Sequence, residues 1–124
     1  MDILESIREL LSEILDIEPQ EVTPDTYIIR DLGVESIDLL ELAVSLNARF
    51  GIEVNDDEVF LLRLRDFVME AGEQGINPAD HLAEKLPFLS GDRVREILAD
   101  LEGGPTLKVA DLVSYVKRQR NGRR

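Results

Sequence analysis

The chain has 124 residues, a length that suits one compact domain, and 44% of them are hydrophobic while 32% are charged. It contains no cysteine, which excludes disulfides, thiolate metal sites and a cysteine nucleophile, so any thiol chemistry requires a thiol from another source. The net charge is −12, and residues 1–59 hold 16 acidic and 3 basic residues, whereas residues 60–124 hold 10 and 11. An acidic half of this kind disfavours nucleic acids and anionic membranes; it either attracts basic protein surfaces or only keeps the protein solvated.

The N-terminus does not have the pattern of an export signal. It begins with acidic residues, where a signal peptide would be basic and then continuously apolar. No apolar run in the chain approaches the roughly 20 residues that cross a bilayer. We therefore expect a monomeric cytoplasmic protein that does not insert stably into a membrane.

The first predicted element is an amphipathic helix over residues 2–15. Its apolar residues recur at spacings of three and four and so share one face: Ile3, Ile7, Leu10, Leu11 and Ile14. Pro19 requires the helix to end before it. A long connection then covers residues 16–35, and a loop of this length in a compact domain is often functional.

A second amphipathic helix is predicted from Ser36 to Phe50, with Gly51 as its stop. Its expected buried stripe comprises Ile37, Leu40, Ala43, Val44 and Leu46. Acidic residues lie on other faces near its start.

The rest of the chain predicts further helices and no convincing strand. Helices are expected over residues 57–71, from Pro78 to about Leu86, from Ser90 or Asp92 onward, and from Thr106 onward. The basic tail, residues 118–124, is expected to fray. The predicted fold class is all-α, an antiparallel bundle.

One segment carries a candidate site, Asp31-Leu32-Gly33-Val34-Glu35-Ser36-Ile37-Asp38. A loop with a glycine delivers Ser36 to the start of a helix, where free backbone N–H groups and the helix dipole favour a phosphate. The flanking carboxylates repel a freely diffusing phosphate but suit one that is attached covalently by an enzyme docked on them. From spacing alone, a serine that caps the helix is the commoner interpretation.

The same segment resembles the attachment motif of acyl carrier proteins, usually Asp-Leu-Gly-x-Asp-Ser-Leu-Asp, with Glu35 and Ile37 in place of an aspartate and a leucine. The resemblance covers residues 1–59 and about 105–117, and residues 60–104 are extra. It implies a single carrier domain over residues 1–124: an acyl-carrier-like four-helix bundle with extra helices inserted before the last helix.

The resemblance also implies a cofactor and partners. A phosphopantetheinyl transferase would attach 4′-phosphopantetheine from coenzyme A to Ser36, and its thiol would carry acyl groups as thioesters. Basic docking patches of acyl-transferring and fatty-acid synthesis enzymes would recognise an acidic face made of Asp31, Glu35, Asp38 and Glu41. The candidate walls of the acyl pocket are Leu42, Leu46, Ile52, Val59 and Leu62. The alternative for each of them is an ordinary position in the hydrophobic core.

The implied function is that of a carrier, not an enzyme, in fatty acid or specialised lipid biosynthesis, such as that of lipid A or lipopolysaccharide. We expect the inserted helices to enlarge or cover the acyl cavity; alternatively they only pack on the bundle or dock one partner. The alternatives for the whole chain are an unmodified helical interaction module with the carrier fold and a carrier of peptidyl or aminoacyl groups. 

A hydrolase would need Ser36, the single histidine His81 and an aspartate, but no nucleophile-elbow glycines surround the serine. His81 is instead expected on a helix surface. No ligand loop for a metal appears in the sequence either.

Overall fold

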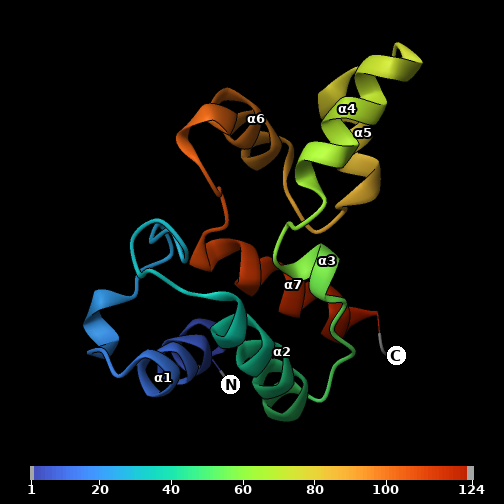
Figure 1. Cartoon of the computed structure of the whole chain (residues 1–124). Helices are drawn as coiled ribbons and strands as arrows, with labels where there is room; N and C mark the ends of the chain where they lie inside the picture. The colour runs from blue at the N-terminus through green and yellow to red at the C-terminus, as the bar shows by residue number, and fades with distance from the viewer. Residues whose placement is uncertain (1, 123–124) are drawn as a thin grey trace.

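The computed structural model describes residues 2–122. Within them it contains seven α-helices, two 3₁₀ turns and no strand beyond one isolated β-bridge, so the prediction of an all-α fold is confirmed (Figure 1). The α-helices are α1 (Ile3–Leu15), α2 (Ser36–Phe50), α3 (Asp56–Val59), α4 (Leu64–Gln74), α5 (Pro78–Lys85), α6 (Gly91–Ala99) and α7 (Val109–Asn121). The 3₁₀ turns are η1 (Pro19–Glu21) and η2 (Leu101–Gly103).

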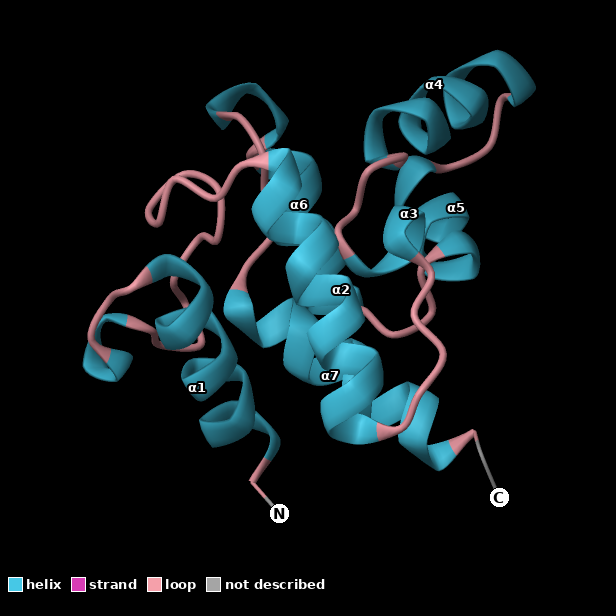
Figure 2. Cartoon of the chain, turned by 60° about the horizontal axis from the view of Figure 1, so that its bottom comes forward, coloured by secondary structure: helices cyan, strands magenta, loops and turns pink. Residues whose placement is uncertain are grey.

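Helices α1, α2, α3 and α7 form the bundle that supports the site. α1 packs against α2 and α7, and α3 packs against α7. In the view of Figure 2, α1 lies on one side of α2 and α7, while α3 to α5 lie on the other. α1 begins where the Asp2 carboxylate accepts a hydrogen bond from the backbone N–H of Glu5, at 3.3 Å. Its predicted apolar face is confirmed at Ile7, Leu10 and Leu11, which are buried.

The prediction of which face of α2 is buried is wrong in part. Ile37 and Val44 are each 70% exposed and Leu40 is 61% exposed, whereas Leu42, Ala43 and Leu46 are buried. The reason is that α2 is apolar around most of its circumference. Positions 37, 40 and 44 and positions 39, 42, 43 and 46 both follow helical spacing, and only the packing of α1 decides which stripe is covered.

The predicted helix over residues 57–71 is two helices. The chain leaves α3 at Phe60, and Leu61 adopts a left-handed backbone conformation with φ of 55° before α4 begins. α4 and α5 then form a helical hairpin, and α5 packs against α6 (Figure 1). The helices expected from Pro78 and from Ser90 are confirmed, and the side chains of Asn77 and Ser90 cap them by accepting hydrogen bonds from the first turns of α5 and α6.

The helices of the insert share the apolar core of the bundle. Buried side chains of residues 82–97 belong to the same cluster as those of α1, α2 and α7: Leu82, Leu86, Phe88, Leu89, Val94 and Ile97. The Phe88 ring meets the Tyr115 ring of α7 edge-on, with centroids 5.1 Å apart. An ion pair between Arg93 of α6 and Asp111 of α7 adds a polar connection, with Nε and Oδ1 2.8 Å apart. The insert therefore packs as part of the bundle.

His81 is buried, which corrects the prediction of a surface position. It is 6% exposed, its Nε2 lies 3.1 Å from Oε2 of Glu70, and its ring lies edge-on to Phe67. Both partners belong to α4, which covers this face of α5; the short pattern of α5 alone could not reveal that neighbour. The hydrogen bond from His81 holds the pKa of the Glu70 carboxyl below its ordinary value.

The last helix begins later and continues farther than predicted. Residues 106–108 are extended and pair with the loop before α2: Ile28 N–H donates to the Leu107 carbonyl and Val109 N–H donates to the Thr26 carbonyl, both at 3.0 Å. α7 then runs to Asn121, so residues 118–121 of the predicted frayed tail are helical. Residues 123–124 of that tail lie outside the described part of the chain.

The candidate attachment site

Ser36 is the first residue of α2, and its side chain is exposed. The N-cap is Glu35, whose backbone N–H donates to Oδ2 of Asp38 at 2.9 Å. Within residues 2–122, no hydrogen bond engages the Ser36 hydroxyl. The interpretation of Ser36 as the capping residue is therefore wrong: Glu35 is the N-cap, Asp38 accepts its N–H, and the serine hydroxyl is left for another role.

The loop before Ser36 is held in one conformation by its own contacts. Gly33 has φ of 68°, a left-handed conformation that a residue with a Cβ adopts only with strain, and its N–H donates to the Ile29 carbonyl at 3.1 Å. The Asp31 carboxylate accepts a hydrogen bond from the N–H of Tyr27 at 2.9 Å. Val34 is buried and anchors the loop to the core immediately before the helix. These contacts fix the backbone that leads into Ser36.

Arg30 connects this loop to the insert, a contact that the spacing of residues in the sequence does not predict. Its guanidinium donates to Oδ2 of Asp100 at 2.7 Å and to the Gly104 carbonyl at 2.9 Å, and it lies 4.4 Å from the centre of the Tyr27 ring. The hydrogen bond from Arg30 holds the pKa of the Asp100 carboxyl below its ordinary value. One feature of the sequence points to a special role for Arg30: it is one of only three basic residues in the acidic segment 1–59.

The four predicted recognition carboxylates lie on the loop and the first two turns of α2. Asp31, Glu35 and Glu41 are exposed, and Asp38 is half-buried. Asp31 and Asp38 both accept backbone hydrogen bonds, so these two also have a structural role. 

The exposed apolar stripe of α2 runs beside these carboxylates. It consists of Ile37, Leu40 and Val44, which lie on one face of the helix at spacings of three and four. An exposed apolar patch with a charged rim is typical of a surface that binds another protein. A shallow groove of about 320 Å³, lined in part by Leu40, Val44 and Val54, continues the patch toward α3.

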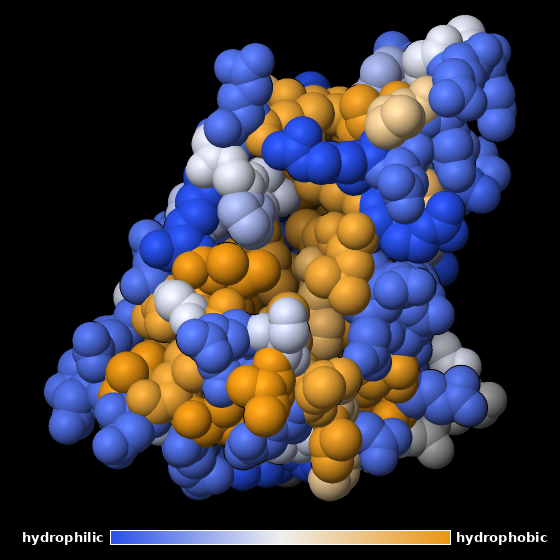
Figure 3. All heavy atoms as spheres, in the orientation of Figure 1, coloured by the Kyte–Doolittle hydropathy of each residue, from blue (hydrophilic) through white to orange (hydrophobic). Residues whose placement is uncertain are grey.

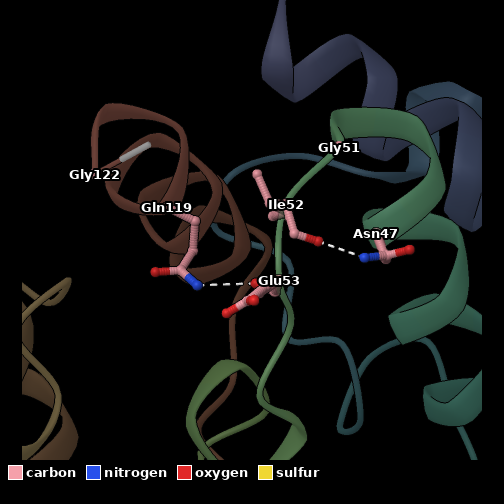
Figure 4. A pocket seen from close by; sticks show the side chains of 6 residues that line it. All are labelled: Asn47, Gly51, Ile52, Glu53, Gln119 and Gly122. Carbon is pink, nitrogen blue, oxygen red and sulfur yellow. Dashed lines mark hydrogen bonds between the residues drawn. The ribbon is translucent and has the colours of Figure 1, made fainter. Parts of the chain in front are cut away.

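The five predicted pocket walls fall into two groups. Leu42, Leu46, Ile52 and Val59 are at most 1% exposed in the core, whereas Leu62 is 54% exposed. A polar pocket of about 620 Å³ touches Ile52, but it lies at the far end of α2, which rises about 20 Å over its 15 residues (Figure 4). There Asn47 donates to the Ile52 carbonyl and Gln119 donates to the Glu53 carbonyl. That pocket is separate from Ser36, and the assignment of the buried four to an acyl pocket stays a prediction.

Residues 5–65, which contain the loop, Ser36 and α2, match the family model described as the phosphopantetheine attachment site. The chain is 39% identical over 69 residues to the acyl carrier protein of Campylobacter hominis, an alignment that covers 55% of this chain and 87% of that protein. The chain belongs to the acyl carrier protein family. Its identity to the acyl carrier proteins of Helicobacter pylori strains G27 and HPAG1 is 34% over 58 residues, covering 47% of this chain and 74% of each relative.

As a member of the acyl carrier protein family, the chain has 4′-phosphopantetheine as its prosthetic group. No solved structure matches the chain. Among residues 2–122, no helix is both long enough and apolar enough to span a bilayer.

Proposed function

We propose that Ser36 is the attachment point of 4′-phosphopantetheine, and that the chain carries acyl groups as thioesters on this arm. The observation that carries the proposal is the exposed Ser36 hydroxyl at the first position of α2, within the matched segment. The arm supplies the thiol that a chain without cysteine lacks. The chain itself acts as a substrate and partner of enzymes and does not catalyse the transfers.

The residues around Ser36 fit a phosphodiester. The first N–H groups of a helix have no partner within the helix, and together with the dipole they stabilise an anion at that position. Glu35 and Asp38 add negative charge nearby, which favours a covalent phosphate over a freely exchanging one. The contacts of Gly33 and the buried Val34 hold the backbone of the loop, so Ser36 stands at a fixed point at the start of α2, where a transferase can reach its hydroxyl.

Partner enzymes would dock on the carboxylates together with the apolar stripe of α2. The partners we propose are a phosphopantetheinyl transferase and acyl-transferring enzymes with basic patches, since Glu35 and Glu41 flank the stripe and stay exposed. Fatty acid synthesis or a specialised lipid pathway, such as that of lipid A or lipopolysaccharide, would supply the cargo. We further propose that residues 1–124 are one domain, with the core at 1–59 and 105–117 and the insert at about 60–104.

Intact mass spectrometry tests the attachment site. The pure protein is incubated with coenzyme A and a broad-specificity phosphopantetheinyl transferase, alongside Ser36→Ala and Ser45→Ala, a control on the same helix. We expect one added phosphopantetheine on the wild type and on Ser45→Ala, and none on Ser36→Ala. A folded wild type that gains no mass would contradict the proposal and would favour an unmodified interaction module that uses the same apolar stripe.

A further inference from the structure

The end of the insert closes around Arg30 of the attachment loop, residues 16–35, which lies beside the link from α6 to α7 (Figure 1). The guanidinium donates to Oδ2 of Asp100 at 2.7 Å, to the Asp100 carbonyl at 3.3 Å and to the Gly104 carbonyl at 2.9 Å. The Tyr27 hydroxyl donates to the same carboxylate at 3.2 Å. In the described part of the chain, every hydrogen bond between the attachment loop and the insert belongs to Arg30 or Tyr27.

Two glycines shape the insert around this guanidinium. A Cβ added at Gly103 would lie 2.9 Å from a terminal nitrogen of Arg30 and 2.6 Å from Oδ1 of Asp100, so a larger residue there would push the two side chains aside. Gly104 has φ of 105° and ψ of −163°, a conformation that essentially only glycine adopts, and its carbonyl accepts the bond from Arg30. A side chain at Gly103 would therefore disturb the contact without changing the charge of the protein.

Arg30 also holds the part of the loop that carries Asp31. Its guanidinium carbon lies 4.4 Å from the centre of the Tyr27 ring, within the range of a cation–π contact. The Tyr27 N–H donates to Oδ2 of Asp31, and the Asp31 N–H donates to the Tyr27 carbonyl, both at 2.9 Å. Asp31 is exposed and is one of the predicted recognition carboxylates. The insert is thus connected to this carboxylate through Arg30 and Tyr27.

The junction of loop and insert is polar at its surface, and the fold does not depend on it. Figure 3 shows hydrophilic and neutral side chains there, to the left of the apolar band that crosses this face. The side chains of Arg30 and Asp100 are 21% and 41% exposed, so water screens their attraction. The insert is held to the bundle mainly by the shared apolar core and by the buried pair of Arg93 with Asp111. Loss of the Arg30 contact should therefore loosen the loop and leave the helices in place.

We propose that Arg30 is a positioning residue for the transfer of phosphopantetheine, and that the insert acts through it on recognition by the transferase. Arg30 fixes the loop so that the Asp31 carboxylate is in place before a basic docking surface meets it. In the reaction, Ser36 Oγ bonds to the phosphorus of coenzyme A that carries pantetheine, adenosine 3′,5′-bisphosphate leaves with the electron pair of the broken P–O bond, and the hydroxyl proton passes to the transferase. Arg30 touches none of these atoms. The inference rests on the proposed function and adds the part that the insert has in it.

Steady-state kinetics of the transferase reaction test the proposal. Initial rates are measured by intact mass at varied concentrations of the carrier, with a broad-specificity phosphopantetheinyl transferase and saturating coenzyme A. Arg30→Met should raise KM for the carrier about fivefold, because docking must then order the loop, and should leave kcat unchanged, because Ser36 stays on α2. Charge alone predicts the opposite change in KM, since removing a cation makes this face more attractive to a basic partner.

Gly103→Ala tests the same contact without a change of charge. The added methyl group would separate the two side chains of the ion pair, so KM should rise as in Arg30→Met. Its control is Gly72→Ala in α4, where no atom lies within 4 Å of the added Cβ. Arg65→Met is the control for the lost cation, because Arg65 donates to the Leu101 carbonyl within the insert and not to the loop. Neither control should raise KM.

A double-mutant cycle identifies the group through which Arg30 acts. Asp31→Asn removes the charge of the carboxylate and keeps an oxygen that can accept the Tyr27 N–H. If Arg30 acts by positioning that charge, Arg30→Met should raise KM less than about twofold in the Asp31→Asn background.

The outcomes separate this proposal from the proposed function. A wild type that gains no phosphopantetheine overturns both. If the wild type is modified but Arg30→Met and Gly103→Ala keep its KM, or if Arg30→Met has its full effect in the Asp31→Asn background, only the role of Arg30 is overturned. A fall in kcat at unchanged KM would also overturn it. Circular dichroism checks that each variant is folded, and Gly103→Ala decides the question if Arg30→Met does not fold.

Discussion

Among the contacts between the insert and the bundle, the ion pair of Arg93 with Asp111 should make one of the largest contributions to the free energy of unfolding. The two side chains are 12% and 2% exposed, and they join through two bonds, Nε to Oδ1 at 2.8 Å and a terminal nitrogen to Oδ2 at 2.9 Å. Asp111 also accepts the backbone N–H of Lys108 at 2.9 Å. Burial lowers the pKa of Arg93, but the hydrogen bond and charge of Asp111 outweigh this and raise the pKa above its ordinary value, so the guanidinium stays charged.

Asp111→Asn keeps the shape of the side chain and removes its charge. Breaking a buried ion pair on one side leaves the other charge uncompensated, which costs about 3 kcal/mol of unfolding free energy. A chain of 124 residues unfolds with about 2.1 cal/mol/K per residue, so each kcal/mol corresponds to about 4 °C and the melting temperature should fall by about 12 °C. Urea unfolding and thermal melts followed by circular dichroism at neutral pH measure both quantities.

The exposed pair Arg95–Asp92 on α6 is the matched control. Its side chains are 67% and 91% exposed, so Asp92→Asn should change the unfolding free energy by less than about 0.5 kcal/mol. A double-mutant cycle with Arg93→Leu and Asp111→Leu should show a favourable coupling of more than about 1 kcal/mol. A loss below about 1 kcal/mol for Asp111→Asn, or a cycle without coupling, would refute the claim that the pair acts as a buried unit.

Three further predictions concern α2, the attachment loop and its contact with the insert. Leu46→Ala should cost about 3 kcal/mol in urea unfolding, because Leu46 is fully buried, whereas Leu40→Asp on the exposed stripe should cost less than about 0.5 kcal/mol. Gly33→Ala should cost about 1 kcal/mol through backbone strain alone, since no atom lies within 4 Å of the added Cβ. Because Arg30 lowers the pKa of Asp100, the stability from this carboxyl is complete above its unfolded pKa and is lost as the pH falls through the lower folded pKa. The stability of Asp100→Asn, measured by urea unfolding between about pH 5 and pH 2, should therefore fall less than that of the wild type.

The sequence alone predicts the features that depend on residues close to one another in the chain. The spacing of Ile7, Leu10 and Leu11 predicts the buried face of α1, and Asn77 and Ser90 mark the helix starts that they cap. The family motif around Ser36 was recognisable because a short contiguous segment carries it.

The errors concern features that depend on a distant partner. α2 has two apolar stripes, and which one is covered depends on the packing of α1. The burial of His81 depends on Glu70 and Phe67 of another helix. The turn at Leu61 uses a conformation that a leucine seldom adopts, so no propensity predicts it. The contact of Arg30 with Asp100 spans 70 residues and has no periodic signature.

The pairing of the attachment loop with residues 106–108 has a consequence for how the chain folds. Ile28 bonds Leu107 across 79 residues, and without residues 60–104 the same contact would close a loop of 34. Closure entropy grows only with the logarithm of loop length, so this extension costs about 0.7 kcal/mol. The α4–α5 hairpin is made of local contacts that form quickly, which shortens the effective loop further. A large segment inserted at this point of the bundle is therefore compatible with rapid, cooperative folding. Variants that shorten or lengthen the segment should change the folding rate mainly by changing the stability of the α4–α5 hairpin, and less by changing the length of the loop that must close.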